Sequence, residues 1–297
     1  MFTERVRRRH VAVPAAIDSS PVLRGMTAIQ VSPTRRARPV LAGGDYQVLV
    51  SEDPADIDAA QKLRYDVFTA EPGYSDAIGD AATGRDADAF DDHCEHMLVR
   101  HLPTGALVGC ARVLPPPRAI AAGGWYSAGE FDLDELLEIR GETVEMGRAV
   151  VAPEHRSGSV TAMLWAAVLN YLEEGGYRYL MGCVSVPLDS ELGRGRALRG
   201  IRDLARDRHR GAWQVYPHRH VRVDGRSLDE LDPPTAIRLP ALLRGYVRLG
   251  ARVCGEPAFD EIFDVGDFLT VLDRHQGDRR YTERLRGAMT RLGSDRG

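Results

Sequence analysis

Hydrophobic and polar positions become regular from about residue 45 of the 297-residue chain. Residues 46–51 (YQVLVS) alternate as a strand does, and residues 53–71 carry a partial apolar stripe at helical spacing. Two apolar runs, 96–102 and 106–115, are separated by Pro-Thr-Gly, which is typical of a β-hairpin. The first part of the chain therefore predicts a strand, a helix and a pair of antiparallel strands.

The pattern continues with further strands and helices. In order, we expect a short acidic helix at 131–139, a strand at 143–151, a helix at 158–174, a buried strand at 177–188, Arg-rich helix and loop material at 191–234, a helix at 234–250 despite Pro240, and two closing strands within 251–273. This order predicts an α/β (α+β) fold with a mixed central β-sheet flanked by helices.

Residues 1–44 differ from the rest, because Arg, Pro, Ala and Ser dominate there and acids are few. Such a composition is typical of a disordered basic arm, and it lacks the apolar centre of a signal peptide. The functional alternative is attraction to the anionic inner face of the cell membrane or to an acidic carrier protein. We expect one main domain at 45–275 and a polar C-terminal tail at 276–297.

Composition narrows the classes of function. A hydrophobic content of 43%, a charged content of 28% and a net charge of −4 describe an ordinary globular protein and argue against nucleic acid as the main partner. No apolar run approaches the roughly 20 residues that span a bilayer. The single lysine, Lys62, disfavours Schiff-base chemistry, and four widely spaced cysteines favour a reducing cytoplasm.

Residues 144–176 join a strand, a tight turn and a long helix. The free N–H groups at a helix N-terminus bind phosphate, which makes Arg156, Gly158 and Ser159 candidates for holding the phosphate of a pantetheine arm. A plain helix cap at Ser157 or Ser159 is the alternative, and it is compatible with that role. Glu145, upstream on the strand, is the candidate general base for an attacking amine. The combination indicates acyl transfer from a pantetheine carrier.

Glu145 and Arg148 lie three residues apart on the predicted strand. Their side chains point to opposite faces unless a β-bulge changes the alternation. The alternative to catalysis is an ordinary ion pair of Glu145 with an arginine. Because guanidinium groups recognise carboxylates in a bidentate manner, Arg64, Arg112 and Arg148 are candidate partners for an acceptor carboxylate or for the acids of the long loop 72–92.

Asp88 and Asp91, at the end of that loop, are candidates for holding acceptor ammonium groups or for fixing the arginines. Turn capping by aspartate is the alternative. His93, Cys94 and His96 suggest a metal site, but no second Cys/His pair completes a zinc site. We therefore expect no metal.

Several segments together resemble the bacterial ornithine N-acyltransferases. They are LRYDVFTAEPG (63–73), AFDDHCEHMLV (89–99), VGCARVLP (108–115), VEMGRAVVAPEHR (144–156) and LLRGYVRLGARVCGEPAFDEIFDVGDFLTVLD (242–273). The resemblance covers about residues 45–275 and implies a GNAT-like fold. It implies transfer of a 3-hydroxyacyl group from acyl carrier protein to the α-amine of ornithine or a similar amino acid, the first step of ornithine-lipid synthesis.

Acyl-homoserine lactone synthases are more distantly similar, through the spacing of Arg64, Phe68, Asp88, Asp91, Arg112, Glu145 and Arg148. The resemblance implies that Glu145 and Arg148 are catalytic. The expected substrate-binding residues are Arg64, Phe68, Asp88, Asp91, His96 and Arg112. We expect no tightly bound cofactor, only the acyl-phosphopantetheine of acyl carrier protein, or acyl-CoA, as the donor.

Two departures from the resemblance leave alternatives open. Arg156 and Gly158 only partly match the spacing of the usual GNAT pyrophosphate signature, which favours a carrier-protein donor and is compatible with coenzyme A. Residues 1–44 and much of 191–234 have no counterpart in the family. The alternative functions are an N-acetyltransferase that uses acetyl-CoA and a GNAT-like module that binds a partner without catalysis.

Overall fold

The computed structural model describes residues 37–74, 77–278, 280, 282–283 and 285. All of them belong to one compact unit, residues 35–297. Most of the predicted basic arm and most of the predicted C-terminal tail lie outside the described residues. None of the described helices is both long enough and apolar enough to cross a bilayer.

The first half of the described chain forms β1 (Arg38–Gly43), β2 (Tyr46–Ser51), α1 (Pro54–Thr69), β3 (Glu95–His101), β4 (Leu107–Leu114), α2 (Pro116–Ala121), the 3₁₀ helix η1 (Tyr126–Gly129), β5 (Phe131–Asp132), the 3₁₀ helix η2 (Asp134–Glu142) and β6 (Thr143–Val151). The second half forms η3 (Pro153–His155), α3 (Ser159–Glu174), β7 (Tyr179–Pro187), α4 (Arg196–Arg208), β8 (Arg210–Pro217), β9 (Arg222–Val223), β10 (Arg226–Ser227), η4 (Leu228–Glu230), α5 (Ala241–Leu249), β11 (Arg252–Gly255), β12 (Ala258–Asp260) and β13 (Val265–Asp273).

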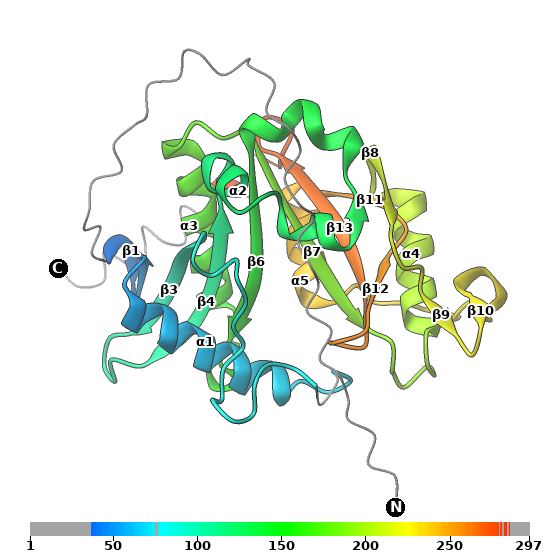
Figure 1. Cartoon of the computed structure of the whole chain (residues 1–297), viewed down its shortest axis with the longest axis horizontal. Coiled ribbons are helices and arrows are strands. Elements are labelled where there is room, and N and C mark those ends of the chain that lie inside the picture. The colour runs from blue at the N-terminus through cyan, green and yellow to red at the C-terminus, as the bar shows by residue number, and fades with distance from the viewer. Residues whose placement is uncertain (1–36, 75–76, 279, 281, 284, 286–297) are drawn as a thin grey trace, which may run out of the picture. The chain divides into compact units, whose positions relative to one another are not determined.

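The main sheet is mixed, as predicted (Figure 1). Its strand order is β1-β2-β3-β4-β6-β7-β13-β11-β8-β5, with β12 paired to β13. The β6–β7 and β11–β8 pairs are parallel, and the other pairs are antiparallel. A parallel neighbour requires a crossover connection, and α3 provides it between β6 and β7.

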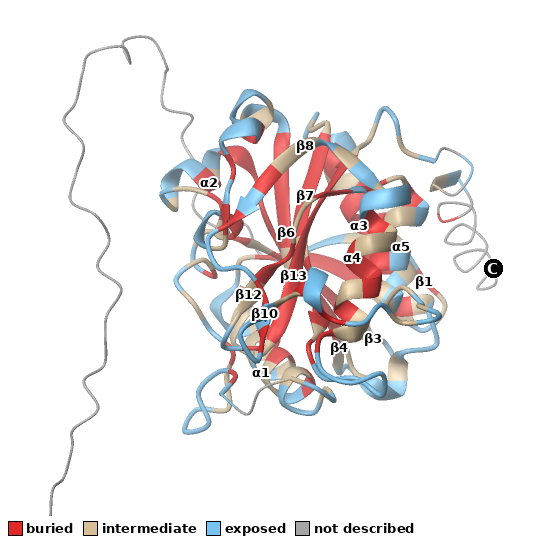
Figure 2. Cartoon of the chain, turned by 90° about the vertical axis from the view of Figure 1, so that its right-hand side faces the viewer, coloured by how far each residue is buried: buried red, intermediate tan, exposed pale blue. Residues whose placement is uncertain are grey.

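Helices cover both faces of the sheet, so its central strands are largely buried, whereas the strands β1 and β8 near its edges are partly exposed (Figure 2). In β2, Val48 and Val50 pack in the cluster that contains α3, whereas Leu49 packs in the cluster of α1. Successive side chains of a strand point to opposite faces, which explains this division. Alternate side chains of YQVLVS therefore belong to two apolar layers, one on each face of the sheet.

The sheet splits between β6 and β7. These strands pair only at Thr143–Tyr179, Val144–Leu180 and Glu145–Met181. β7 continues along β13 over its whole length, while β6 continues along β4. At the end of the paired stretch, a Cβ on Gly182 would collide with the carbonyl oxygen of Met146. The missing side chain allows the close approach of the two backbones just before they separate.

Most of the predicted elements are confirmed, with five corrections. Residues 38–43, assigned to the basic arm, form the edge strand β1, so the fold begins before residue 45. Strand β8 and the β9–β10 hairpin lie in the segment expected to be helix and loop, and three strands close the fold where two were expected. The helix predicted at 234–250 begins at Ala241, because Pro240 serves as its N-cap. The acidic segment 131–139 is partly β5 and partly the 3₁₀ helix η2.

Candidate active site

A cavity of about 460 Å³ opens where β6 and β7 separate. Residues 145–151 of β6 form one wall, and Cys183, Ser185 and Pro187 of β7 contribute to the opposite one. This volume lies in the range of small-molecule sites, roughly 300–1,000 Å³. Because β6 is not paired with β7 beyond Glu145, its backbone groups on that side are available to a ligand.

A β-bulge shapes the β6 wall. Arg112 pairs with Gly147, and Cys110 pairs with Val150, so two residues of β6 oppose the single Ala111 of β4. The first of the two, Arg148, has a φ of 51°, in the left-handed region that non-glycine residues rarely adopt. The bulge changes the alternation of side chains, and both Glu145 and Arg148 line the cavity.

Glu145 is held by the N-terminal end of η1. The backbone N–H groups of Tyr126 and Ser127 donate to its carboxylate at 2.6 and 2.8 Å, and the Ser127 hydroxyl also donates. Burial raises the pKa of Glu145, although these hydrogen bonds oppose the effect. A carboxylate with a raised pKa, at the wall of a cavity, has the properties of a general base for an amine.

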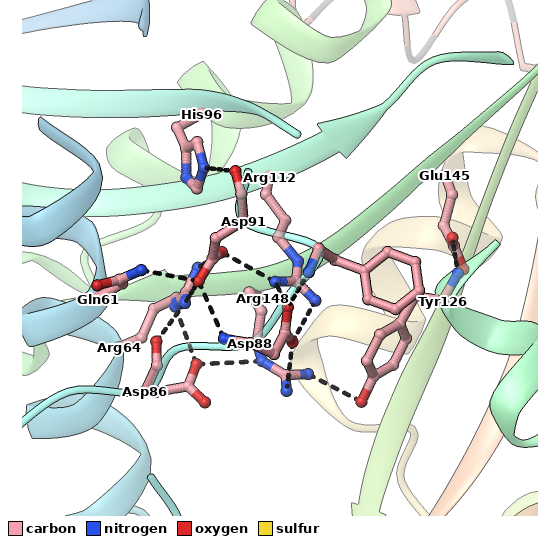
Figure 3. Close-up of polar contacts among 11 residues, drawn as sticks. Gln61, Arg64, Asp86, Asp88, Asp91, His96, Arg112, Tyr126, Glu145 and Arg148 are labelled. Atoms are coloured by element: carbon pink, nitrogen blue, oxygen red, sulfur yellow. Dashed lines mark hydrogen bonds and ion pairs between the residues drawn. The ribbon is translucent and has the colours of Figure 1, made fainter. Parts of the chain in front are cut away.

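Three arginines and three aspartates form a closed ring beside the cavity, in which every arginine bridges two aspartates (Figure 3). In ring order, with N···O distances from 2.6 to 3.4 Å, the members are Arg64, Asp86, Arg148, Asp88, Arg112 and Asp91. We call this set the arginine–aspartate ring. Its aspartates come from the long loop 72–92, in which Asp88 and Asp91 were predicted to hold the acceptor or to fix the arginines.

The ring favours the ionised form of Asp88 and Asp91. Burial alone would raise the pKa of Asp91, but the hydrogen bonds and charges of Arg64 and Arg112 lower it well below its usual range. The pKa of Asp88 is also lowered, since Arg112 and Arg148 outweigh its burial. Paired in this way, the buried charges compensate one another.

The predicted substrate-binding residues divide into two groups. Phe68 and Arg112 line the cavity, and the Phe68 ring contacts Phe263 edge to face at 5.4 Å between centroids. The others are Arg64, Asp88, Asp91 and His96, which are not among the residues that line it. Asp91 illustrates their role, because its backbone oxygen contacts His96 Nε2 at 3.2 Å while its carboxylate binds ring arginines. These residues position Arg112 and Arg148.

The predicted phosphate-binding residues lie at the start of α3. Arg156 lines the cavity, donates to Glu71 at 2.8 Å and is 44% exposed. Gly158 is the N-cap of α3 with a φ of 103°, and Ser159 is its first residue. Of the three, Arg156 alone is among the cavity-lining residues, together with Thr161 from the first turn of the helix.

Sequence reasoning missed several polar residues of the site. They are Asp86, Tyr126, Ser127, Glu130, Asp260 and Asp267. Of these, Glu130, Asp260 and Asp267 form a cluster that could hold a cation, with carboxylate oxygens within 4.8 Å of one another. Asp267 had a visible signal, since it is an acid inside the apolar strand VGDFLTVL. Tyr126 and Ser127 had none, because their backbone N–H groups, which hold Glu145, leave no trace in a sequence pattern.

Part of the chain matches a known family. Residues 63–166 match the family model described as acetyltransferase (GNAT) domain, which confirms the predicted fold class. The solved structures that match the chain include those of two proteins with a TM-score of 0.47. One is the CoA-dependent acyl-homoserine lactone synthase BjaI (16% identity, 81% of this chain and 83% of that chain), and the other is FeeM, an N-acyl amino acid synthase from uncultured soil microbes (15%, 78% and 92%).

Curated relatives are closer in sequence. The L-ornithine N(alpha)-acyltransferase of Brucella abortus (strain 2308) is 32% identical over 250 residues, which cover 80% of this chain and 88% of the relative. That of Rhizobium meliloti (strain 1021) is 32% identical over 245 residues, covering 80% and 83%. The chain therefore belongs to the L-ornithine N(alpha)-acyltransferase family and is an N-acyltransferase.

Proposed function

We propose that this enzyme transfers a 3-hydroxyacyl chain from the phosphopantetheine of acyl carrier protein to the α-amine of ornithine or a similar amino acid, beginning ornithine-lipid synthesis. The observation that carries the proposal is the cavity at the β6–β7 split, which combines a buried carboxylate, Glu145, with an apolar wall. The names of the curated relatives support the acceptor.

The apolar wall suits a long acyl chain. Leu164 and Trp165 of α3 and Leu242 and Tyr246 of α5 line the cavity. Burial of each methylene group contributes about 0.8 kcal/mol, so a fatty chain gains much more from such a wall than an acetyl group does. This favours a fatty acyl donor over acetyl-CoA.

The donor's phosphate is proposed to bind at the start of α3. The side chain of Arg156 is partly exposed, and the unpaired N–H groups and dipole of the helix N-terminus attract an anion. The same arrangement suits acyl carrier protein and coenzyme A. The Arg-rich residues 1–36, outside the described part of the chain, are proposed to assist contact with an acidic carrier or with the inner face of the membrane.

The proposed reaction uses a single complex of donor and acceptor. Glu145 takes one proton from the acceptor ammonium, and the resulting amine attacks the thioester carbon. Backbone N–H groups of residues 147–151 stabilise the oxyanion that forms, because β6 lacks a partner on this side. The C–S bond then breaks, and the second proton leaves the nitrogen for the pantetheine thiolate. The products are an amide and a free thiol.

The test is mass spectrometry of products from the purified chain, supplied with L-ornithine and either 3-hydroxyacyl carrier protein or acetyl-CoA. We expect N-acyl-ornithine from the carrier-protein donor, with tandem fragmentation that locates the acyl group on the α-nitrogen. The Glu145→Gln variant serves as the control for uncatalysed transfer. Exclusive acetyl transfer would refute the proposed donor, and acylation of the δ-nitrogen would refute the proposed position.

A further inference from the structure

The cavity holds three carboxylates that the reaction described above does not use. Glu130 follows η1, Asp260 ends β12, and Asp267 lies in β13. All three line the cavity, and their carboxylate oxygens lie within 4.8 Å of one another. We call this set the acidic cluster. Two distant parts of the chain, the residue after η1 and the paired strands β12 and β13, thus bring like charges together beside the candidate base.

Two oxygens of the acidic cluster lack a protein partner. Asp267 is only 3% exposed, and its Oδ1 has no hydrogen bond with any described residue. The same holds for Glu130 Oε2. An unsatisfied buried acceptor costs about 1–3 kcal/mol, and more when it is charged. Such oxygens, facing a cavity, are suited to a ligand that carries several hydrogen-bond donors.

The positive charge near the acidic cluster is too small to neutralise it. Burial and mutual repulsion raise the pKa of Glu130 and of Asp267, although Arg148 opposes the effect at Asp267. The Arg148 guanidinium already forms ion pairs with Asp86 and Asp88 of the arginine–aspartate ring. A bound cation would relieve the repulsion that the ring leaves unbalanced.

The acidic cluster and the base lie along one wall. The Ser127 hydroxyl donates to Glu145 and contacts the Cys183 thiol at 3.3 Å, and the nearby Glu130 carboxylate helps to raise the pKa of that thiol. Two small side chains therefore separate Glu145 from Glu130. A molecule with two amines a few bonds apart can place one at each carboxylate.

We propose that the acidic cluster binds the second ammonium group of a diamino-acid acceptor and so selects a basic amino acid over its neutral analogues. An ammonium group offers three N–H donors, which matches three converging carboxylates. This inference rests on the proposed function, because it requires an amino acid whose α-amine is acylated at Glu145. It assigns the acidic cluster to specificity and not to proton transfer.

The experiment compares L-ornithine with L-norvaline, which has the same carbon chain without the δ-amine. We measure kcat/KM for both acceptors in the wild type and in the Asp267→Asn and Glu130→Gln variants. The wild type should prefer ornithine by more than about 100-fold, because a site built for a polar group rejects the analogue that lacks it. Each variant should lose about 10–100-fold on ornithine, consistent with a lost hydrogen bond to a charged group, and little on norvaline.

Two further variants control for folding. Asp260→Asn retains an oxygen that can accept from the N–H groups of Ile262 and Phe263, so it removes charge from the acidic cluster without opening the turn. It should reduce ornithine selectivity as the other variants do. Glu261→Gln, next to it and paired with Arg219 in solvent, should match the wild type on both acceptors.

Other results would overturn the inference. Equal losses on ornithine and norvaline would indicate a structural role for the acidic cluster, and unchanged selectivity would leave it no role in recognition. Activity that depends on added Mg²⁺ or Ca²⁺ and disappears with a chelator would assign it to a metal. A wild type that acylates ornithine and norvaline equally would overturn this inference alone, whereas one that acylates neither would overturn the proposed function as well.

Discussion

Glu145 and Arg148 lie three residues apart on β6, yet both side chains line one cavity. A regular strand would direct them to opposite faces. The β-bulge at Arg148, which has a φ of 51°, brings both side chains to the same side. Tyr126 links the two residues. Its backbone N–H donates to Glu145, and its hydroxyl group accepts from Arg148 at 3.2 Å (Figure 3).

The Glu145→Gln variant should fold normally and lose about 10²–10⁴-fold in kcat, because general-base catalysis contributes that much. In the wild type, kcat/KM should rise with pH through the raised pKa of Glu145, since only the deprotonated carboxylate accepts a proton. Steady-state kinetics across pH should show that this acidic limb is absent from the variant.

The matched control is Glu142→Gln, an exposed glutamate just before β6. It should retain the wild-type rate and pH profile. If Glu145→Gln kept the acidic limb and the rate, another group would be the base.

Asp91→Asn should destabilise the fold by about 3–5 kcal/mol, because removing one member of a buried ion-pair network leaves its partners uncompensated. Asp91 is 2% exposed and bridges Arg64 and Arg112. Urea unfolding measures the loss as a lower midpoint at constant slope. The control is Glu174→Gln, at an exposed pair with Arg38, which should leave the midpoint unchanged. An unaltered midpoint in Asp91→Asn would mean that the ring does not stabilise the fold.

The contribution of Asp91 should depend on pH in a defined direction. Its folded-state pKa lies below the unfolded value of about 3.9, so the stabilisation is complete above that value and is lost as pH falls through the folded pKa. The difference in unfolding free energy between the wild type and Asp91→Asn should therefore be constant near neutrality and shrink below about pH 4. A difference that grew on acidification would contradict this assignment.

Cys183→Ser should retain most of the activity, although Cys183 lines the cavity. Burial raises the pKa of the thiol well above its ordinary value, and a protonated thiol is a poor nucleophile. Intact-protein mass spectrometry during turnover should show no acylated enzyme. An acyl adduct that disappears in the serine variant would instead establish a two-step mechanism.

Leu242→Trp should shift the enzyme toward shorter acyl chains, because the larger side chain occupies space in the apolar part of the cavity. Each methylene group that no longer fits removes about 0.8 kcal/mol of binding, or roughly fourfold in kcat/KM. A series of acyl donors of increasing length measures the change. Leu242→Ile, which conserves volume, should keep the wild-type preference. If the tryptophan variant kept the wild-type preference for acyl-chain length, the acyl chain would bind elsewhere.

Local pattern was sufficient for the central elements. Strand 143–151, the β3–β4 hairpin and the helix ended by Gly175 are set by alternation, turn chemistry and capping, which act between residues close in sequence. The edge strand β1 and strand β8 were missed, because short strands are stabilised by partners far along the chain and carry a weak signal of their own.

The amino-acid sequence by itself determined the mixed sheet, the family and the identity of Glu145 and the three arginines as candidates. Only the tertiary structure decided how they meet. The bulge at Arg148, the backbone donors of Tyr126 and Ser127 and the convergence of the acidic cluster depend on register and on long-range packing. Electrostatic energy depends on distance and burial, and neither is a property of spacing along a chain.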